Sequence, residues 1–463
     1  MGTTVKRGEW KMLFEGENAV KAIALALGVA LHATNIYLST TILPSVVKEI
    51  GGLEWYAWNT TVFVITSIIG AVISAFFLAH SGPKVTYRSA IIVFVIGALI
   101  CMQAPSMTVM LIGRAIQGFG GGLLFALSYA MVRIIFTENL WARAMALVSS
   151  MWGVAAFSGP FIGGIFAEFN QWRLAFATIG LLCLPLLWMT ERTLPGKEKS
   201  VNAPVMQVPY TRLFLLALAA IAVSTGSLLS RIEYSISTLV LAILLFVLTL
   251  LLDKKSTNKL LPSGTYRKAS MLKIYFLVMG LLTIATTVEI YVPYFSQMLF
   301  NFSPLRAGYF TVLIAVGWTA CSVLFSGAGR SKLSLVVTCG TVMMLAGLIL
   351  LVFMSSVAYT PITVTLIGLA LVMTGGGIGI CWPHLITAVF LQAEQGEEEI
   401  TSSSVTTIQL IATAFGAALA GLVTHIAGIA NGAEGVRHAA IVLYGCFAAA
   451  PLLALIIWKK GKK

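Results

Sequence analysis

The feature that most constrains the fold of this 463-residue chain is an almost unbroken succession of apolar runs separated by short polar connections. A helix needs about 20 mainly apolar residues to cross the hydrocarbon core of a bilayer. Hydrophobic residues make up 58% of the sequence and charged residues only 10%, whereas about a quarter of the residues in soluble domains are charged. Strands of alternating polarity, which are typical of transmembrane barrels, are absent from the sequence. We therefore predict an all-α protein embedded in a lipid bilayer.

Short polar segments divide the apolar sequence into fourteen expected spans, in groups of six, two and six. The expected spans cover residues 19–47, 55–79, 86–104, 106–135, 141–168, 172–190, 211–230, 234–252, 271–299, 304–326, 332–356, 360–392, 400–429 and 437–458. The fourth helix of each group of six carries a glycine cluster, GFGGG from Gly118 and GGGIG from Gly375. This weak similarity between the two groups of six is expected for a transporter built from two parallel repeats.

The grouping predicts the organisation of the whole chain. Its expected parts are a cytoplasmic N-terminal segment at 1–18, a six-helix lobe at 19–190, a linker with two additional helices at 191–270, a second six-helix lobe at 271–458 and a basic tail at 459–463.

The net charge of +13 follows from membrane topology. Most Lys and Arg residues fall in alternate connections, together with the two termini, and this bias is the positive-inside rule. The rule places both termini in the cytoplasm. Because topology explains the charge, we predict no nucleic-acid partner.

Enzymatic or cofactor chemistry has no signal in the sequence. The six cysteines fall within apolar runs without metal-ligand spacing and read as small core residues. Phosphate-binding loops and the spacing of catalytic triads are absent. We predict that the chain is not an enzyme, with no cofactor and no metal.

Two of the first six spans carry polar residues on one helical face. In the fourth span, Arg114 and Gln117 share a face with Gly121, Phe125 and Ser128. In the first span, His32 and Asn35 share a face with Gly28 and Ser39. A guanidinium at membrane depth costs at least about 2.5 kcal/mol, so it should face a partner or a wet cavity. The alternatives are an arginine satisfied by backbone carbonyls and a histidine that makes an interhelical hydrogen bond.

The ninth span contains Glu289, the one acidic residue in the middle of any expected span. Burial in lipid disfavours a charged carboxylate, so this group is suited to bind and release a proton. On a continuous helix it would lie in a polar stripe formed by Thr283, Thr286, Glu289, Pro293, Ser296 and Gln297. We predict a coupling role for Glu289; a purely structural role is the alternative.

The remaining candidates concern packing and the substrate cavity. In the fifth span, small residues and a proline predict a helix that bends and packs closely. These residues are Gly153, Gly159, Pro160, Gly163 and Gly164. The candidate cavity residues, besides Asn35 and Gln117, are Trp58, Tyr291, Tyr294, Gln297, Trp382 and His384. For any one aromatic residue, an interfacial belt or core packing is the alternative. The acidic run Glu394–Glu399 reads as a solvated loop without a function.

Three stretches resemble the fourteen-helix drug:proton antiporter branch of the major facilitator superfamily. SGPFIGG from Ser158 is similar to the antiporter motif of the fifth helix, and GRAIQGFGGG from Gly113 is similar to the fourth-helix motif that includes Arg114 and Gln117. IYVPYFSQMLFNFSPLRAGYF, from Ile290, resembles the stretch that follows the central helix pair. The resemblance implies two six-helix lobes with two inserted helices, working by rocker-switch alternating access.

Two positions depart from that branch. Asn35 stands where the first helix of the branch carries an Asp, and His80 stands where the loop after the second helix carries one. Asn35 calls into question proton coupling through the first helix, and His80 calls into question the cytoplasmic gating charge pair of the branch.

The sequence thus predicts a proton-coupled exporter of small amphipathic molecules or drugs in the bacterial inner membrane. Its partners would be a small-molecule substrate, protons and the lipid bilayer, and we expect a monomer. Glu289 would bind the coupling proton, with Arg114 and His32 contributing to coupling. The alternatives are an exporter of an endogenous metabolite such as a siderophore and a membrane scaffold or sensor that has lost transport.

Overall fold

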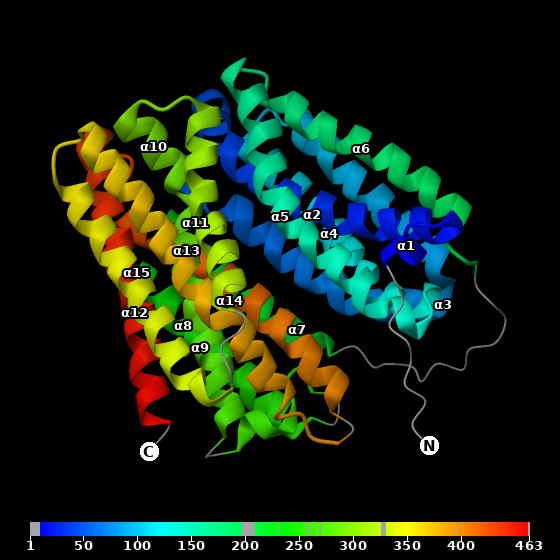
Figure 1. Ribbon diagram of the computed structural model, residues 1–463. Helices are drawn as coiled ribbons and strands as arrows, with labels where there is room; N and C mark the ends of the chain where they lie inside the picture. Colours follow the sequence, from blue (N-terminus) through cyan, green and yellow to red (C-terminus); the bar gives the residue numbers. More distant parts are fainter. Residues whose placement is uncertain are drawn as a thin grey trace. The chain divides into compact units, whose positions relative to one another are not determined.

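The computed structural model describes residues 10–196, 209–229, 231–256, 259–267, 270–325, 330–395 and 397–461, and these ranges consist of helices joined by short loops (Figure 1). Fourteen stretches within them are long and apolar enough to cross a membrane, which confirms the predicted number of spans. The outer parts of the predicted N-terminal segment and C-terminal tail, at 1–9 and 462–463, lie outside the described residues, as does the linker section 197–208.

The described residues form two compact units. The first contains residues 10–51 and 66–196. Its helices are α1 (Trp10–Leu13), α2 (Gly16–Ile50), the larger part of α3 (Trp58–Met102), α4 (Met107–Ile135), α5 (Glu138–Glu168) and α6 (Trp172–Thr193). Within α3, Gly82 has φ +77°, a conformation that favours glycine, and Pro83 follows it, so the second and third spans separate at this kink.

The second unit contains residues 52–65 and the described residues from 209 to 461. It begins with the short η1 (Leu53–Trp55) and the inserted pair, α7 (Tyr210–Thr225) with η2 (Gly226–Leu228), and α8 (Ile232–Lys255). There follow η3 (Ser263–Tyr266), α9 (Met271–Thr286), η4 (Thr287–Ile290), α10 (Val292–Phe300), α11 (Pro304–Phe325), η5 (Arg330–Lys332), α12 (Leu333–Ser356), α13 (Pro361–Phe390), α14 (Glu398–Ile426) and α15 (Gly432–Lys460).

Segment 52–65 differs from the expectation for the first lobe, because its contacts assign it to the second unit. Tyr56 stacks on Tyr291 with ring centroids 4.8 Å apart, and the Trp58 indole N–H donates to the Ser224 carbonyl at 3.0 Å. The lobe boundaries expected from sequence remain a prediction.

Glycines bring helices into backbone contact in both units. A Cβ atom added at Gly122 would lie 2.0 Å from the Ser67 carbonyl oxygen, and one added at Gly375 would lie 1.8 Å from the Ile314 carbonyl oxygen. Helices associate in lipid largely by such close packing, since lipid tails are as apolar as the side chains. The two glycine clusters therefore serve the same packing role in their respective units.

The ninth span is not the continuous helix that its sequence predicts. It consists of α9, the 3₁₀ turn η4 and α10. Pro293 has no N–H to donate to the Glu289 carbonyl four residues earlier, and its ring would collide with that carbonyl in a regular helix. Glu289 therefore lies at a helix break, and the α-helical periodicity behind the predicted polar stripe does not continue through the turn.

Candidate functional site

In the first unit, the predicted faces of the first and fourth spans meet at His32. The imidazole packs against the Phe125 ring at 5.3 Å between centroids and meets Trp152 of α5 edge-on at 6.3 Å. A Cβ atom added at Gly121 would lie 2.7 Å from His32 Nδ1, so the absence of a side chain there makes room for the ring. His32 is 1% exposed. The structure thus brings together His32 and the Gly121–Phe125 face.

Gln117 and Arg114 lie one and two turns before Gly121 on the same face of α4. Both are fully buried, and the Arg114 guanidinium donates to the Gln117 side-chain oxygen at 2.8 Å. The Gln117 amide nitrogen has no hydrogen-bond acceptor among the described residues. A buried donor left without a partner costs about 1–3 kcal/mol, so this nitrogen is available to a polar ligand or water.

Asn35 is the second incompletely satisfied group in this unit. It is 0% exposed, and neither its side-chain nitrogen nor its oxygen has a hydrogen-bond partner within the described part of the chain. It lies one turn beyond His32 on α2, while Gln117 lies one turn before Gly121 on α4. Because consecutive spans alternate in direction, α2 and α4 are antiparallel, and the contact of His32 with Gly121 places Asn35 and Gln117 at a similar level.

Tyr87 of α3 completes this polar face and was not predicted. Its hydroxyl lies 2.9 Å from the Ser128 hydroxyl and donates to the Ala24 carbonyl at 3.2 Å. A Cβ atom at Gly28 would lie 2.0 Å from the Tyr87 oxygen, so the glycine is needed for the phenol to fit. The sequence around a single tyrosine in an apolar span does not reveal which distant residues its hydroxyl will contact.

In the second unit, Glu289 lies on η4 and is partly exposed. Its carboxylate makes no hydrogen bond or ion pair with any of the residues that the structure describes. Neighbouring hydroxyls are satisfied locally, since Thr283 and Thr286 donate to carbonyls of α9. An acidic group at a helix break, without a fixed counter-ion, is able to change its protonation state without breaking a structural ion pair.

An aromatic cluster follows Glu289 in the chain. Tyr56 contacts Tyr291 and also Tyr294, whose ring centroid is 5.4 Å away. Phe295 stacks on Tyr291 at 5.7 Å. The Tyr56 hydroxyl is buried without a hydrogen-bond partner among the described residues. Two predicted cavity residues, Tyr291 and Tyr294, thus lie together, and sequence reasoning missed Tyr56 because it comes from a distant segment.

The other predicted cavity residues are placed separately. Trp58 donates a hydrogen bond to the Ser224 carbonyl of α7, as described above. Trp382 packs edge-on against Trp318, with ring centroids 5.6 Å apart. His384 makes a 2.9 Å hydrogen bond to the Phe325 carbonyl at the end of α11. The Gln297 side-chain nitrogen is buried without a partner in the described residues. These contacts give Trp58 and His384 structural partners of the kind expected for interhelical contacts.

The fifth-span residues pack α5 against α2. A Cβ atom at Gly159 would lie 2.5 Å from Tyr37 Cβ, and one at Gly163 would lie 2.9 Å from the Leu38 carbonyl oxygen. Pro160 and Gly164 are buried beside them, whereas a Cβ atom at Gly153 would meet nothing within 4 Å. Close packing therefore applies to Gly159 and Gly163, and bending of α5 stays a prediction.

The helical architecture agrees with the comparisons with known proteins. The profile of the Major Facilitator Superfamily matches residues 25–417. The chain belongs to this superfamily. It is therefore a multi-pass membrane transporter and not an enzyme, as its sequence predicts.

Relatives within the superfamily cover almost all of the chain. A probable multidrug-efflux transporter of Mycobacterium tuberculosis is 35% identical over 451 residues, with 95% of each chain covered. The multidrug transporter protein MdtP of Bacillus subtilis is 22% identical, and the alignment covers 89% of this chain and 77% of that protein. The crystal structure of a D-xylose–proton symporter matches the fold with a TM-score of 0.65 at 16% identity, covering 96% of this chain and 98% of that one.

Proposed function

We propose that this major facilitator transporter exports drug-like or other small amphipathic molecules in exchange for protons, by alternating access, as a monomer in the bacterial inner membrane. The names of the relatives in Mycobacterium tuberculosis and Bacillus subtilis support drug efflux. The observation that carries the proton-coupling part is Glu289, an acidic residue at a helix break with no ion-pair partner in the described residues. Such a carboxyl binds and releases a proton as its surroundings change.

The polar residues at the candidate site of the first unit would contribute to the same function, although none of them is a carboxylate. Arg114 is buried and bonded to Gln117, and Asn35 occupies the position that carries an Asp in the branch that the sequence resembles. We therefore assign proton binding to Glu289, with Arg114 and His32 setting the electrostatics of the first unit. Asn35, Gln117, Tyr291 and Tyr294 are proposed to contact substrate.

A substitution at Glu289 tests this proposal. Purified Glu289→Gln protein is reconstituted into liposomes, and uptake of a fluorescent cationic dye is followed with and without an imposed pH gradient. The expected result is loss of the gradient-driven component, while exchange of dye down its own gradient persists. Glu54→Gln, which changes an exposed acidic residue on η1, serves as the matched control. Equal gradient-driven transport by the parent and Glu289→Gln would remove Glu289 from the coupling step.

A second candidate substrate class is favoured by the first unit itself. A buried guanidinium that is bonded to the neutral Gln117, in a unit where Asn35 stands in place of an Asp, suits an anionic ligand such as a siderophore-type chelator. Competition between the cationic dye and anionic chelators in the same liposomes separates the two classes. Inhibition by the chelators and transport of a labelled chelator would select this candidate.

A further inference from the structure

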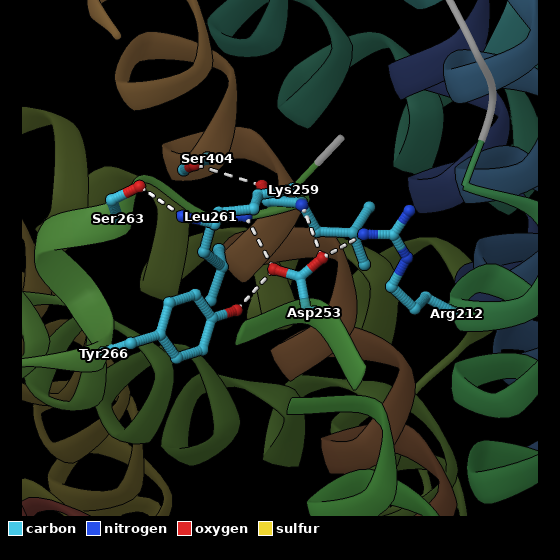
Figure 2. Close-up of polar contacts among 8 residues, drawn as sticks. Arg212, Asp253, Lys259, Leu261, Ser263, Tyr266 and Ser404 are labelled. Atoms are coloured by element: carbon cyan, nitrogen blue, oxygen red, sulfur yellow. Dashed lines mark hydrogen bonds and ion pairs between the residues drawn. The ribbon is translucent and has the colours of Figure 1, made fainter. Parts of the chain in front are cut away.

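A buried carboxylate, Asp253 at the end of α8, joins the inserted pair of helices to the segment that follows them in the second unit. Figure 2 shows Asp253 at the centre of its partners. It is 1% exposed and accepts from the Arg212 guanidinium of α7 at 2.7 Å. It also accepts from the backbone N–H of Leu260 at 2.7 Å and of Leu261 at 3.2 Å. The Tyr266 hydroxyl donates to Asp253 Oδ2, which also accepts from Leu261, whereas Arg212 and Leu260 donate to Oδ1.

The phenol is a fixed donor in this arrangement. Burial, together with the adjacent Asp253 carboxylate, raises the pKa of Tyr266 well above its ordinary value, so the hydroxyl keeps its proton. A buried carboxylate is tolerated when it is paired and its lone pairs are satisfied, as they are here. Asp253 thereby fixes the segment 259–267 against the ends of α7 and α8.

The same segment is bound on its other side by the loop between α13 and α14. The Ser263 backbone N–H and hydroxyl donate to the two oxygens of Glu397, at 2.9 and 2.6 Å. Arg267 forms an ion pair with Glu394 at 2.8 Å, and the Ser404 hydroxyl donates to the Leu260 carbonyl at 3.3 Å. The acidic run is therefore not merely a solvated loop, as its sequence suggests, because two of its carboxylates hold segment 259–267.

Along the rest of their length, α7 and α8 pack directly on α14. Small apolar residues from the three helices form one buried cluster, made of Ala219, Ala222, Val223, Ala242, Ala418 and Leu422. Phe246 of α8 meets Phe415 of α14 edge-on at 5.5 Å. At the far end, the His425 ring donates to the Leu229 carbonyl at 3.2 Å. The three helices are thus joined at both ends and in the middle.

Helix α14 in turn contacts the turn that carries Glu289. A Cβ atom at Gly416 would lie 2.4 Å from the Thr287 hydroxyl oxygen, so α14 approaches η4 without an intervening side chain. The path of contacts therefore runs from Asp253 through α7 and α8 to α14, and from α14 to η4.

We propose that Asp253, Glu394 and Glu397 form a latch that fixes the inserted helices α7 and α8 to α14, so that the three helices move as one body and position the Glu289 turn. The three acidic residues are positioning residues that do not touch the substrate. The positioning part of the proposal, from α14 to Glu289, rests on the proposed function of that residue. The mechanical part, in which the latch fixes α7 and α8 to α14, does not.

Hydrogen–deuterium exchange of the full-length protein in nanodiscs tests the mechanical part without a substrate. Asp253→Asn weakens the pairing with Arg212 and places a donor beside the Leu260 or Leu261 N–H. We expect faster exchange in segment 259–267 and also in α7 and the first half of α14. The matched control is Glu233→Gln at the opposite end of α8, where the side chain is exposed. Exchange in α14 equal to that of the parent would overturn the latch.

Glu397 provides a second variant if Asp253→Asn does not fold. Glu397→Ala removes both acceptors of Ser263, whereas Glu397→Gln keeps one acceptor oxygen. We expect accelerated exchange in segment 259–267 and α14 for Glu397→Ala and near-parental exchange for Glu397→Gln. Identical exchange in these two variants would contradict a role for the hydrogen bonds.

Transport by the same proteins tests the positioning part. A latch variant should lower the maximal rate about three- to tenfold with little change in KM, because coupling through packed elements is modest. Faster exchange in α14 with an unchanged maximal rate would overturn the positioning of the Glu289 turn. Slower transport together with unimpaired coupling in Glu289→Gln would leave the latch standing and remove Glu289 from the proposal.

Discussion

At the scale of single residues, the first unit tolerates polar groups that are costly to bury. Asn35 is fully enclosed, and its amide has no hydrogen-bond partner in the described residues. Its neighbour Thr34 has a partner, since the two hydroxyl oxygens of Thr34 and Ser158 lie 3.0 Å apart. An unsatisfied polar side chain gives the fold no stability, so its presence points to a role in function.

Replacing the Asn35 amide by an apolar group of similar size should therefore separate stability from function. We expect Asn35→Leu to leave the thermal midpoint unchanged or to raise it, because removal of an unpartnered buried amide relieves a cost of about 1–3 kcal/mol. Dye transport should fall severalfold. Unfolding is followed by tryptophan fluorescence in detergent.

Thr34→Val is the comparison variant on the same helix. It removes a hydroxyl that has a partner and leaves Ser158 without one, so the thermal midpoint should fall by the equivalent of about 1 kcal/mol. A lower midpoint for Asn35→Leu than for Thr34→Val would mean that the Asn35 amide is satisfied in the membrane-embedded protein.

At the scale of elements, helix α5 depends on two glycines one turn apart. Gly159 and Gly163 allow its backbone to contact α2, while Gly153 of the same helix faces open space. The antiporter-like motif SGPFIGG thus has a direct packing role.

Enlarging a glycine should have different consequences inside this motif and five residues before it. Gly159→Leu overpacks the contact with Tyr37 and should cost about 1–3 kcal/mol or abolish folding. Gly153→Leu should change stability by less than about 0.5 kcal/mol. Thermal unfolding and size-exclusion profiles of the two variants check this. Equal destabilisation by both substitutions would contradict the packing seen here.

The helix break at Glu289 yields a second element-scale prediction. Pro293→Ala restores an N–H that is able to donate to the Glu289 carbonyl, and it removes the ring that collides with that carbonyl. We expect α9 and α10 to gain continuity, the thermal midpoint to rise, and gradient-driven transport to fall because the carboxyl is moved. A thermal midpoint and transport rate both equal to the parent's would show that Pro293 does not cause the break.

Sequence patterns predicted the elements well and their partners poorly. Apolar runs predicted the fourteen spans because a helix needs about 20 mainly apolar residues to cross the lipid. Faces on single helices were also predictable, as the meeting of His32 with Phe125 shows. Pro293 signalled a break that the expectation of one continuous helix ignored.

Long-range pairing was outside the reach of those patterns. Glu397 bonds Ser263, which is 134 residues away in the chain, and Tyr56 stacks on Tyr291. Neither pair is related by helical periodicity, so only the folded structure brings them together. Because its partners lie far away in the sequence, the acidic run Glu394–Glu399 was predicted to be a solvated loop.

At the scale of the whole molecule, orientation follows from the distribution of charge. The chain carries 30 Lys and Arg residues against 17 Asp and Glu residues, and the basic ones favour the connections predicted to be cytoplasmic. We expect a fluorescent protein fused after the C-terminus to fluoresce in cells. Alkaline phosphatase fused at the same point should be inactive. Phosphatase activity from that fusion would place the C-terminus outside and reverse the predicted topology.

The latch also limits how this protein can be recombined with its relatives. A chimera that exchanges α7 and α8 together with the segment 259–267 would bring a foreign segment to a loop whose Glu394 and Glu397 are spaced for Arg267 and Ser263. This exchange should succeed only when the loop between α13 and α14 is exchanged with it. Segment 259–267 and the loop between α13 and α14 are distant in sequence, but we expect them to be exchangeable between relatives only as a single module.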